Sequence, residues 1–124
     1  MKRILVSGAS GFIGRAVTDE LSKSIHDVKY LMRANPAGSG IIPLDLESEY
    51  SLADQLKGWQ PEVLLHLAWA KIPDFSLAQC QLNLASSLRL IEQSLKLKCK
   101  KIVISGSCWE YGAVSDEVFE NTPP

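Results

Sequence analysis

Three glycines near the start of the chain constrain its fold more than any other feature. Gly8, Gly11 and Gly14 follow an apolar run at Lys2–Val6 and precede residues 12–24, where apolar side chains recur at helical spacing. Glycines in this arrangement permit a tight turn, let a pyrophosphate approach the backbone, and allow the helix to pack closely on the strand. The free N–H groups at the start of the helix attract an anion. The segment therefore predicts a dinucleotide-binding turn, although such glycines can also form a purely structural one.

The residues of this turn are the first candidates for contact with a dinucleotide. The turn is not a P-loop, because no Gly-Lys-Ser/Thr stands at the required distance after Gly8. The strand before it and the amphipathic helix after it favour binding over a structural role. The candidate cofactor-binding residues here are Gly8, Ser10, Gly11, Phe12, Ile13 and Gly14.

Segments typical of strands and helices alternate along the rest of the chain. Further strands are expected at 28–32, 41–42, 63–67 and 102–104, and further helices at 48–56, with Ser48 as N-cap, and at 75–97. Strands that alternate with helices form parallel sheets through right-handed crossovers, with helices on both faces. We therefore predict an α/β fold with a doubly wound parallel Rossmann sheet of about five strands, in the order 3-2-1-4-5.

The composition is that of one soluble domain over residues 1–124. Of the 124 residues 46% are hydrophobic, and 13 Lys and Arg balance 14 Asp and Glu, so charge gives no reason to expect nucleic acid or a membrane as partner. No apolar run approaches the roughly 20 residues of a membrane-spanning helix. The three cysteines contain no C-x-x-C pair, which favours free thiols in the cytoplasm. No metal site is expected.

The end of the second predicted strand bears on the choice of dinucleotide. An NAD site commonly has Asp or Glu there to hold the ribose hydroxyls. This strand instead ends at Arg33, and Asp27 precedes it. The guanidinium of Arg33 can pair with a 2′-phosphate, which favours NADP(H) over NAD(H). The alternative is an exposed arginine that contacts no ligand.

Five short segments, taken in their order along the chain, carry a resemblance to a known family. They are GASGFIG at 8–14, LDL at 44–46, HLA at 66–68, LNL at 82–84 and SGSCWEYG at 105–112. Together they resemble the extended short-chain dehydrogenase/reductases, and within these the NAD(P)-dependent epimerase/dehydratase family that acts on nucleotide sugars. The resemblance covers nearly the whole chain. It implies reversible hydride transfer between a nucleotide-sugar carbon and the nicotinamide of a bound dinucleotide.

The resemblance also implies roles for particular residues in cofactor binding. Asp45 and Leu46 would meet the adenine, and Leu67 and Ala68 would pass the ribose and nicotinamide. Asn83 on the long helix would help to shape the cofactor pocket. Taken alone, Asp45 could simply start a turn.

Two residues near the expected reaction centre are read differently. Ser107 stands at the place of the family's catalytic serine, where its hydroxyl would hydrogen-bond a reacting oxygen; without the resemblance it is only a loop serine. His66 lies in an apolar run at a strand end, which is more typical of a core histidine with satisfied hydrogen bonds than of a base or a metal ligand. We assign no catalytic role to His66.

The chain departs from the family pattern in ways that bear on catalysis. Trp69 stands where the family usually has a small residue, and Glu110 replaces the valine before Tyr-Gly. The family's catalytic Tyr-x-x-x-Lys motif is absent, because the residues four places after the three tyrosines are Ala34, Asp54 and Ser115. We therefore expect an amino-terminal part of a longer enzyme, which binds the dinucleotide but turns over little or nothing. The alternative is a non-catalytic dinucleotide sensor or interaction module.

The helix expected at 75–97 carries more apolar side chains than one interface needs. One face is expected to meet the sheet, and the width of the stripe leaves a second face for another partner. In the family this helix contributes to a dimer, so we expect a homodimer through it. The stripe consists of Leu77, Leu84, Leu88, Ile91 and Leu95, widened by Leu82, Ala85 and Leu90.

Overall fold

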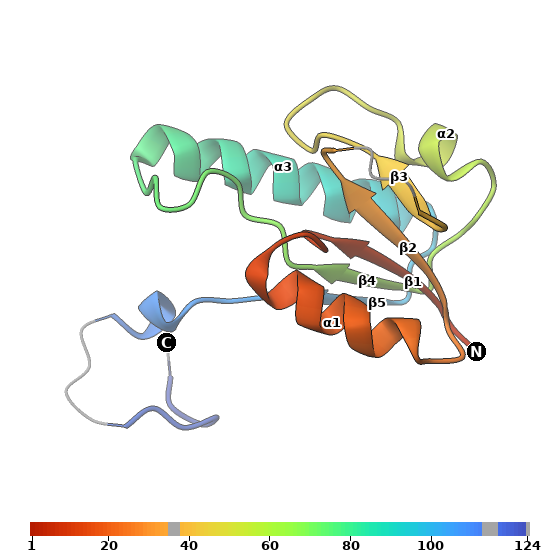
Figure 1. Ribbon diagram of the computed structural model, residues 1–124. Helices are drawn as coiled ribbons and strands as arrows, with labels where there is room; N and C mark the ends of the chain where they lie inside the picture. The colour runs from red at the N-terminus through yellow and green to blue at the C-terminus, as the bar shows by residue number, and fades with distance from the viewer. Residues whose placement is uncertain (35–37, 113–116, 124) are drawn as a thin grey trace.

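A parallel sheet forms the centre of the computed structural model, which describes residues 1–34, 38–112 and 117–123, with the backbone alone at 108 and 109 (Figure 1). Its strands lie in the order β3-β2-β1-β4-β5, and every pair of neighbours is parallel. This confirms the predicted fold class and strand order. The strands are β1 (Arg3–Ser7), β2 (Asp27–Met32), β3 (Ile41–Pro43), β4 (Val63–His66) and β5 (Lys101–Ile104).

Helices cover both faces of the sheet, as expected for right-handed crossovers. Helix α1 (Phe12–Ser22) lies on one face, and α2 (Leu52–Leu56) and α3 (Leu77–Lys96) lie on the other (Figure 1). A short 3-10 helix, η1 (Cys108–Tyr111), follows β5. None of the helices in the described segments is long and apolar enough to cross a bilayer.

The core has two parts because successive side chains of the central strand β1 point to opposite faces. Leu5 packs in a cluster with Leu90 of α3 and with side chains of α2. Ile4 and Val6 belong to a second cluster, against which Leu21 of α1 packs. Both faces of β1 are thus shielded from water, and its carboxyl end is held rigidly where the glycine turn begins.

The starts of α2 and α3 differ from those expected from the sequence. Ser48 is not the N-cap of α2; its N–H and hydroxyl donate to the carbonyl oxygen of Asp45, at 3.1 and 2.7 Å. Ser51 caps the helix instead, accepting from the N–H of Asp54. Both serines suit a cap; on either side of Ser51 the chain is held by Gln93 of α3, whose side chain accepts from the N–H of Leu52 and donates to the carbonyl oxygen of Tyr50. Similarly, α3 begins after its N-cap Ser76, two residues later than expected.

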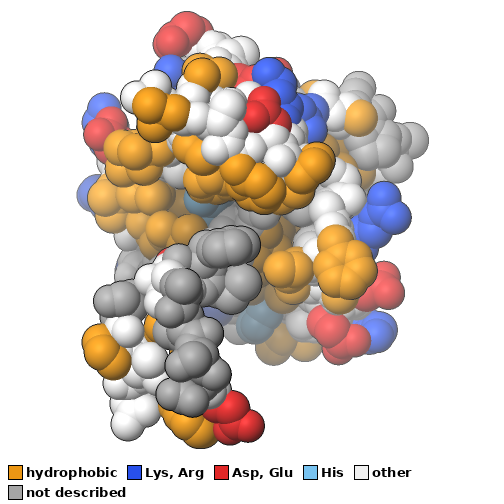
Figure 2. Space-filling view, turned by 90° about the vertical axis from the view of Figure 1, so that its left-hand side faces the viewer, with side chains coloured by type: hydrophobic (Ala, Val, Ile, Leu, Met, Phe, Trp, Pro, Cys, Tyr) orange, Lys and Arg blue, Asp and Glu red, His pale blue; other side chains and the backbone are white. Residues whose placement is uncertain are grey.

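Helix α3 turns mostly polar side chains toward the sheet and, apart from the buried Leu90, its leucines toward solvent. Its buried residues are Gln79, Asn83, Ser86, Leu90 and Ser94, of which only one is apolar. Most of the predicted stripe is exposed, from 50% at Leu88 to 74% at Leu77. Figure 2 shows hydrophobic side chains across the upper part of the end of the molecule where α3 begins. The polar inner face is used to hold loops at the carboxyl edge of the sheet.

Candidate functional site

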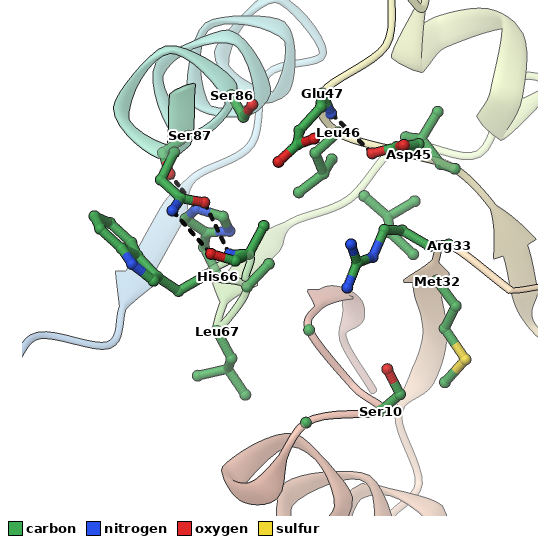
Figure 3. Close-up of a pocket in the computed structure, with 18 residues that line it drawn as sticks. Ser10, Met32, Arg33, Asp45, Leu46, Glu47, His66, Leu67, Ser86 and Ser87 are labelled. Atoms are coloured by element: carbon green, nitrogen blue, oxygen red, sulfur yellow. Dashed lines mark hydrogen bonds between the residues drawn. The ribbon is translucent and has the colours of Figure 1, made fainter. Parts of the chain in front are cut away.

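A pocket lies at the carboxyl edge of the sheet, between the loops that follow β1 to β4 and the first half of α3 (Figure 3). Ligands of open α/β sheets bind at this edge. Nine of the predicted cofactor-binding residues line it: Gly8, Ser10, Gly11, Arg33, Asp45, Leu46, Leu67, Ala68 and Asn83. Residues that the sequence did not assign to the site also line it, among them Glu47, His66, Trp69 and Ser87.

The turn after β1 can be built only from glycines at two of its positions. Gly8 has φ +76°, and a Cβ there would lie 2.6 Å from the amide nitrogen of Ala68 in the loop after β4. A Cβ at Gly14 would lie 2.0 Å from the carbonyl oxygen of Gly8. The turn is closed by a hydrogen bond of 3.0 Å from the N–H of Gly11 to that same oxygen. Backbone thus packs directly on backbone around the start of α1.

The start of α1 is open to an anion. Its N-cap, Gly11, has no side chain that could accept from the first N–H groups of the helix, so these groups are available to a ligand. Phe12 and Ile13, which were predicted to bind the cofactor, have exposed side chains and do not line the pocket. Gly14 packs against the turn. For these three residues only the backbone can serve a ligand.

Two charged residues, Arg33 and Asp45, line the pocket on the side formed by the loops after β2 and β3. Arg33, directly after β2, is exposed and points into the pocket (Figure 3). Asp45 after β3 starts a turn, because its Oδ1 accepts from the N–H of Glu47 at 3.0 Å. Asp45 also lines the pocket. A role in the turn and a place at the ligand site are therefore compatible for this residue.

Asn83 shapes the pocket by holding the loop after β4. Its side-chain oxygen accepts from the N–H of Ala70 at 2.8 Å, and its side-chain nitrogen donates to the Ala70 carbonyl at 3.1 Å. Asn83 is buried on α3, so both hydrogen bonds are protected from water. They fix the backbone on both sides of Ala70, directly after Trp69, which is exposed and lines the pocket.

His66 is a buried histidine with satisfied hydrogen bonds, as its sequence context indicated. Its ring is 3% exposed; Nδ1 is hydrogen-bonded to the hydroxyl of Ser7, and Nε2 to the hydroxyl of Ser87 on α3, at 2.8 Å. Burial lowers the pKa of the imidazole, which favours the neutral form. Neither bond was foreseeable from the sequence, because Ser7 and Ser87 are 59 and 21 residues away.

Ser107, the predicted catalytic serine, is not among the residues that line this pocket. It lies after β5 and is exposed, and its N–H donates to Glu110 Oε1 at 2.9 Å. The carboxylate that replaces the family's valine therefore holds the turn that leads into η1. In the described part of the chain no three potential metal ligands come together.

Residues 4–124 match the sequence profile described as the NAD dependent epimerase/dehydratase family. The chain belongs to this family. Among curated proteins it is similar to methionine adenosyltransferase 2 subunit beta from Mus musculus, with 33% identity over 99% of this chain and 35% of the relative. It is 29% identical to the L-arabinose 1-dehydrogenase (NAD(P)(+)) of Haloferax volcanii, over 86% of this chain and 41% of that protein. The family member described here thus spans well under half the length of these relatives.

Several solved structures are similar to this chain. MoeE5 in complex with UDP-glucuronic acid and NAD has a TM-score of 0.79 and 28% identity, covering 98% of this chain and 42% of its own. The UDP-glucose 4-epimerase of Thermotoga maritima, solved with UDP-glucose, has a TM-score of 0.74 and 26% identity. The match covers 94% of this chain and 41% of the epimerase. This member of the family therefore matches the amino-terminal arrangement of strands and helices in larger relatives.

Proposed function

We propose that residues 1–124 bind a nicotinamide dinucleotide and form the cofactor-binding part of an enzyme that acts on a nucleotide sugar. The observation that carries this proposal is the glycine cradle at Gly8 and Gly14, where any Cβ would collide with backbone, beside the open start of α1. Such a cradle suits a pyrophosphate, which must approach the main chain closely. MoeE5, whose structure is similar to this chain, was solved with NAD and UDP-sugars.

The pocket offers suitable groups along the length of a dinucleotide. The start of α1 would hold the pyrophosphate, while Asp45 and Leu46 would lie at the adenine and the 67–70 loop at the nicotinamide side. Arg33 would pair with a 2′-phosphate, so we propose NADP(H) in preference to NAD(H). When bound, the nicotinamide would supply hydride transfer. A calorimetric titration with NADH and NADPH tests the proposal, and failure of both to bind would contradict it.

We further propose that catalysis depends on groups outside residues 1–124. Ser107 would hydrogen-bond a reacting oxygen, and a Tyr-x-x-x-Lys pair from another part of the protein would relay the proton. General acid–base assistance of this kind contributes about 10²–10⁴-fold, so residues 1–124 alone would bind the dinucleotide and turn over little. The support for this is that the chain lacks the motif and spans only 35–41% of its curated relatives.

A second candidate function is that of a non-catalytic subunit that binds a dinucleotide. Several relatives are named as the beta subunit of methionine adenosyltransferase 2, at 30–33% identity over 99% of this chain. Dinucleotide binding would be common to both candidates. An assay of the full-length protein with UDP-glucose and NAD that follows both the sugar and the reduced nicotinamide would separate them, because only the enzyme would convert the sugar, whether or not the hydride is returned to it.

The exposed leucines of α3 support a proposal about assembly. Leu77, Leu84, Leu88 and Leu95 recur on one side of the helix and are each at least half exposed. An apolar stripe of this length is unusual on a free surface. We propose that it is covered in a homodimer through α3.

Cys80 and Cys99 are free thiols, which supports a cytoplasmic location.

A further inference from the structure

The buried imidazole of His66 links three elements that frame the pocket. His66 is the last residue of β4 and is paired in the sheet with Ser7, the last residue of β1. Its two ring nitrogens are hydrogen-bonded to Ser7 and to Ser87 of α3. Ser7 directly precedes Gly8, and the loop after β4 directly follows His66. One side chain therefore connects the glycine turn, the 67–70 loop and the long helix.

These connections coincide with the closest backbone contacts of the site. The Cβ that Gly8 lacks would meet the backbone at Leu67 and Ala68, so the glycine turn and the 67–70 loop touch each other directly. Helix α3 holds that loop at two points, at His66 through Ser87 and at Ala70 through Asn83. The two helix residues are four apart and hence on one face of α3. A shift of the His66 ring would move the carboxyl ends of β1 and β4 relative to α3.

We propose that His66 is a positioning residue for the dinucleotide, and that its imidazole holds the glycine turn against the 67–70 loop in the arrangement needed for binding. The inference rests on the proposed function, because it concerns the same pocket. His66 touches no reacting atom in this account. It acts through the backbone of Gly8 and of the loop.

The surroundings of His66 explain why the neutral form is required. Its partners on β1 and α3 are serines, and its sheet neighbour on β5 is Ile104. The charged residues that line the pocket are Arg33, Asp45 and Glu47 from the loops after β2 and β3; Arg33 and Asp45 lie across the pocket from His66, and the carboxylate of Glu47 accepts from Gln79 of α3 at 3.5 Å (Figure 3). No carboxylate is hydrogen-bonded to the ring in the described segments. An imidazolium here would be buried without a counter-charge, so protonation would drive the ring out of this arrangement.

The test is the affinity for NAD⁺, which has no 2′-phosphate to titrate, measured by calorimetry from about pH 8 to about pH 5.5, across the ordinary histidine range. The wild-type protein should bind more weakly as the pH falls. His66→Asn should bind about tenfold more weakly at the upper pH, as expected for loss of a buried hydrogen bond, and should lose the pH dependence. Ser87→Ala should weaken binding but keep the pH dependence, because His66 still titrates.

The matched control is His26→Asn, at the opposite end of the sheet, where His26 accepts a hydrogen bond from the N–H of Lys2. It should keep both the affinity and the pH profile of the wild type. If the wild type binds NAD⁺ and His66→Asn binds equally well with the same profile, the positioning role is wrong and the proposed function stands. If the wild type does not bind at all, the proposed function is wrong.

In that second case, hydrogen exchange of the ligand-free protein decides the positioning role. His66→Asn should speed up exchange at the amides of Gly11, Leu67 and Ala70, which are hydrogen-bonded to Gly8, Ser7 and Asn83. The amide of Tyr30, bonded to Gly40 on the β2 side, should exchange at the wild-type rate. Unchanged exchange at the first three amides would overturn the inference whether or not a dinucleotide binds.

Discussion

The carbonyl oxygen of Gly8 occupies the space that a side chain at Gly14 would need: a Cβ there would lie 2.0 Å from it and 2.8 Å from backbone atoms of Ala9. Neither neighbour can yield, because both belong to the main chain between β1 and α1. This relationship joins the fold to the candidate function, since the same close packing brings the start of α1 to the pocket.

Replacing Gly14 by alanine should therefore destabilise the protein by about 3 kcal/mol, at the upper end of the usual cost of overpacking. Gly58→Ala is a suitable control, because Gly58 has a positive φ but nothing within 4 Å of its Cβ position. That variant should lose only about 1–2 kcal/mol from backbone strain. Urea denaturation measures both, and equal losses would show that the contact with Gly8 is unimportant.

The stability of the protein should fall in mild acid because of His66. Burial lowers the pKa of its imidazole below the ordinary value of 6.5, so the unfolded chain takes up a proton at a higher pH than the folded chain. The contribution is constant above about pH 6.5 and is lost as the pH falls from there toward the folded pKa. Urea midpoints across this range should show the decline in the wild type, and His66→Asn should lack it.

Acid below this range should act through different groups. The backbone N–H of Arg3 donates to the carboxylate of Glu62, and the backbone N–H of Ser76 donates to that of Asp74. Each hydrogen bond lowers the pKa of its carboxyl group. These contributions are present above the ordinary carboxyl values and are lost only below them. A decline in stability that begins at carboxyl pH in both the wild type and His66→Asn would show that His66 is not the group responsible.

Arg33 should determine the preference between the two dinucleotides. If its guanidinium pairs with the 2′-phosphate, NADPH should bind about tenfold more tightly than NADH, as a charge-assisted hydrogen bond allows. Arg33→Ala should weaken NADPH alone and make the two affinities equal. Lys23→Ala removes a positive charge beside Glu20 at the far end of α1 and should leave the preference unchanged. Equal binding of both ligands by the wild type would contradict the role of Arg33.

The apolar stripe of α3 should control association. Leu84→Glu and Leu88→Glu would each place a charge in the centre of the proposed dimer interface and should convert dimers into monomers. Ile25→Glu adds the same charge at an exposed apolar position between α1 and β2, away from α3, and should leave the dimer intact. Light scattering coupled to gel filtration over a range of concentrations measures this. A wild-type protein that stays monomeric at high concentration would contradict the assembly.

The parts of the fold that could be predicted depend on local patterns. The glycine turn, the alternation of strands and helices and the strand order follow from spacing along the chain and the handedness of crossovers. The orientation of α3 could not be predicted, because apolar periodicity marks a stripe without saying what it meets. Here Asn83, Ser86 and Leu90 face the sheet and the other leucines of the stripe face outward.

Other features of the site depend on contacts that spacing does not reveal. Both Ser48 and Ser51 suit a helix cap, and the contacts on either side of Ser51 come from Gln93 on α3, more than 40 residues along the chain. His66 was recognised as a satisfied core residue, but its two serines come from distant parts of the chain. The sequence places Trp69 on the loop after the fourth strand, where it can face either the cleft or the edge of the core, and the structure shows that it lines the pocket.

The central claim is that a dinucleotide binds across the glycine turn and the 67–70 loop, and amide chemical shifts during a titration with NADPH test it most directly. The largest changes should occur at Gly11, Phe12 and Ile13, at the start of α1, and at Ala68 and Trp69 across the pocket. Amides near Trp59, whose indole is bonded to Asp27 at the other end of the sheet, should not shift. Saturable binding that shifts other amides and leaves the glycine turn unchanged would contradict the account.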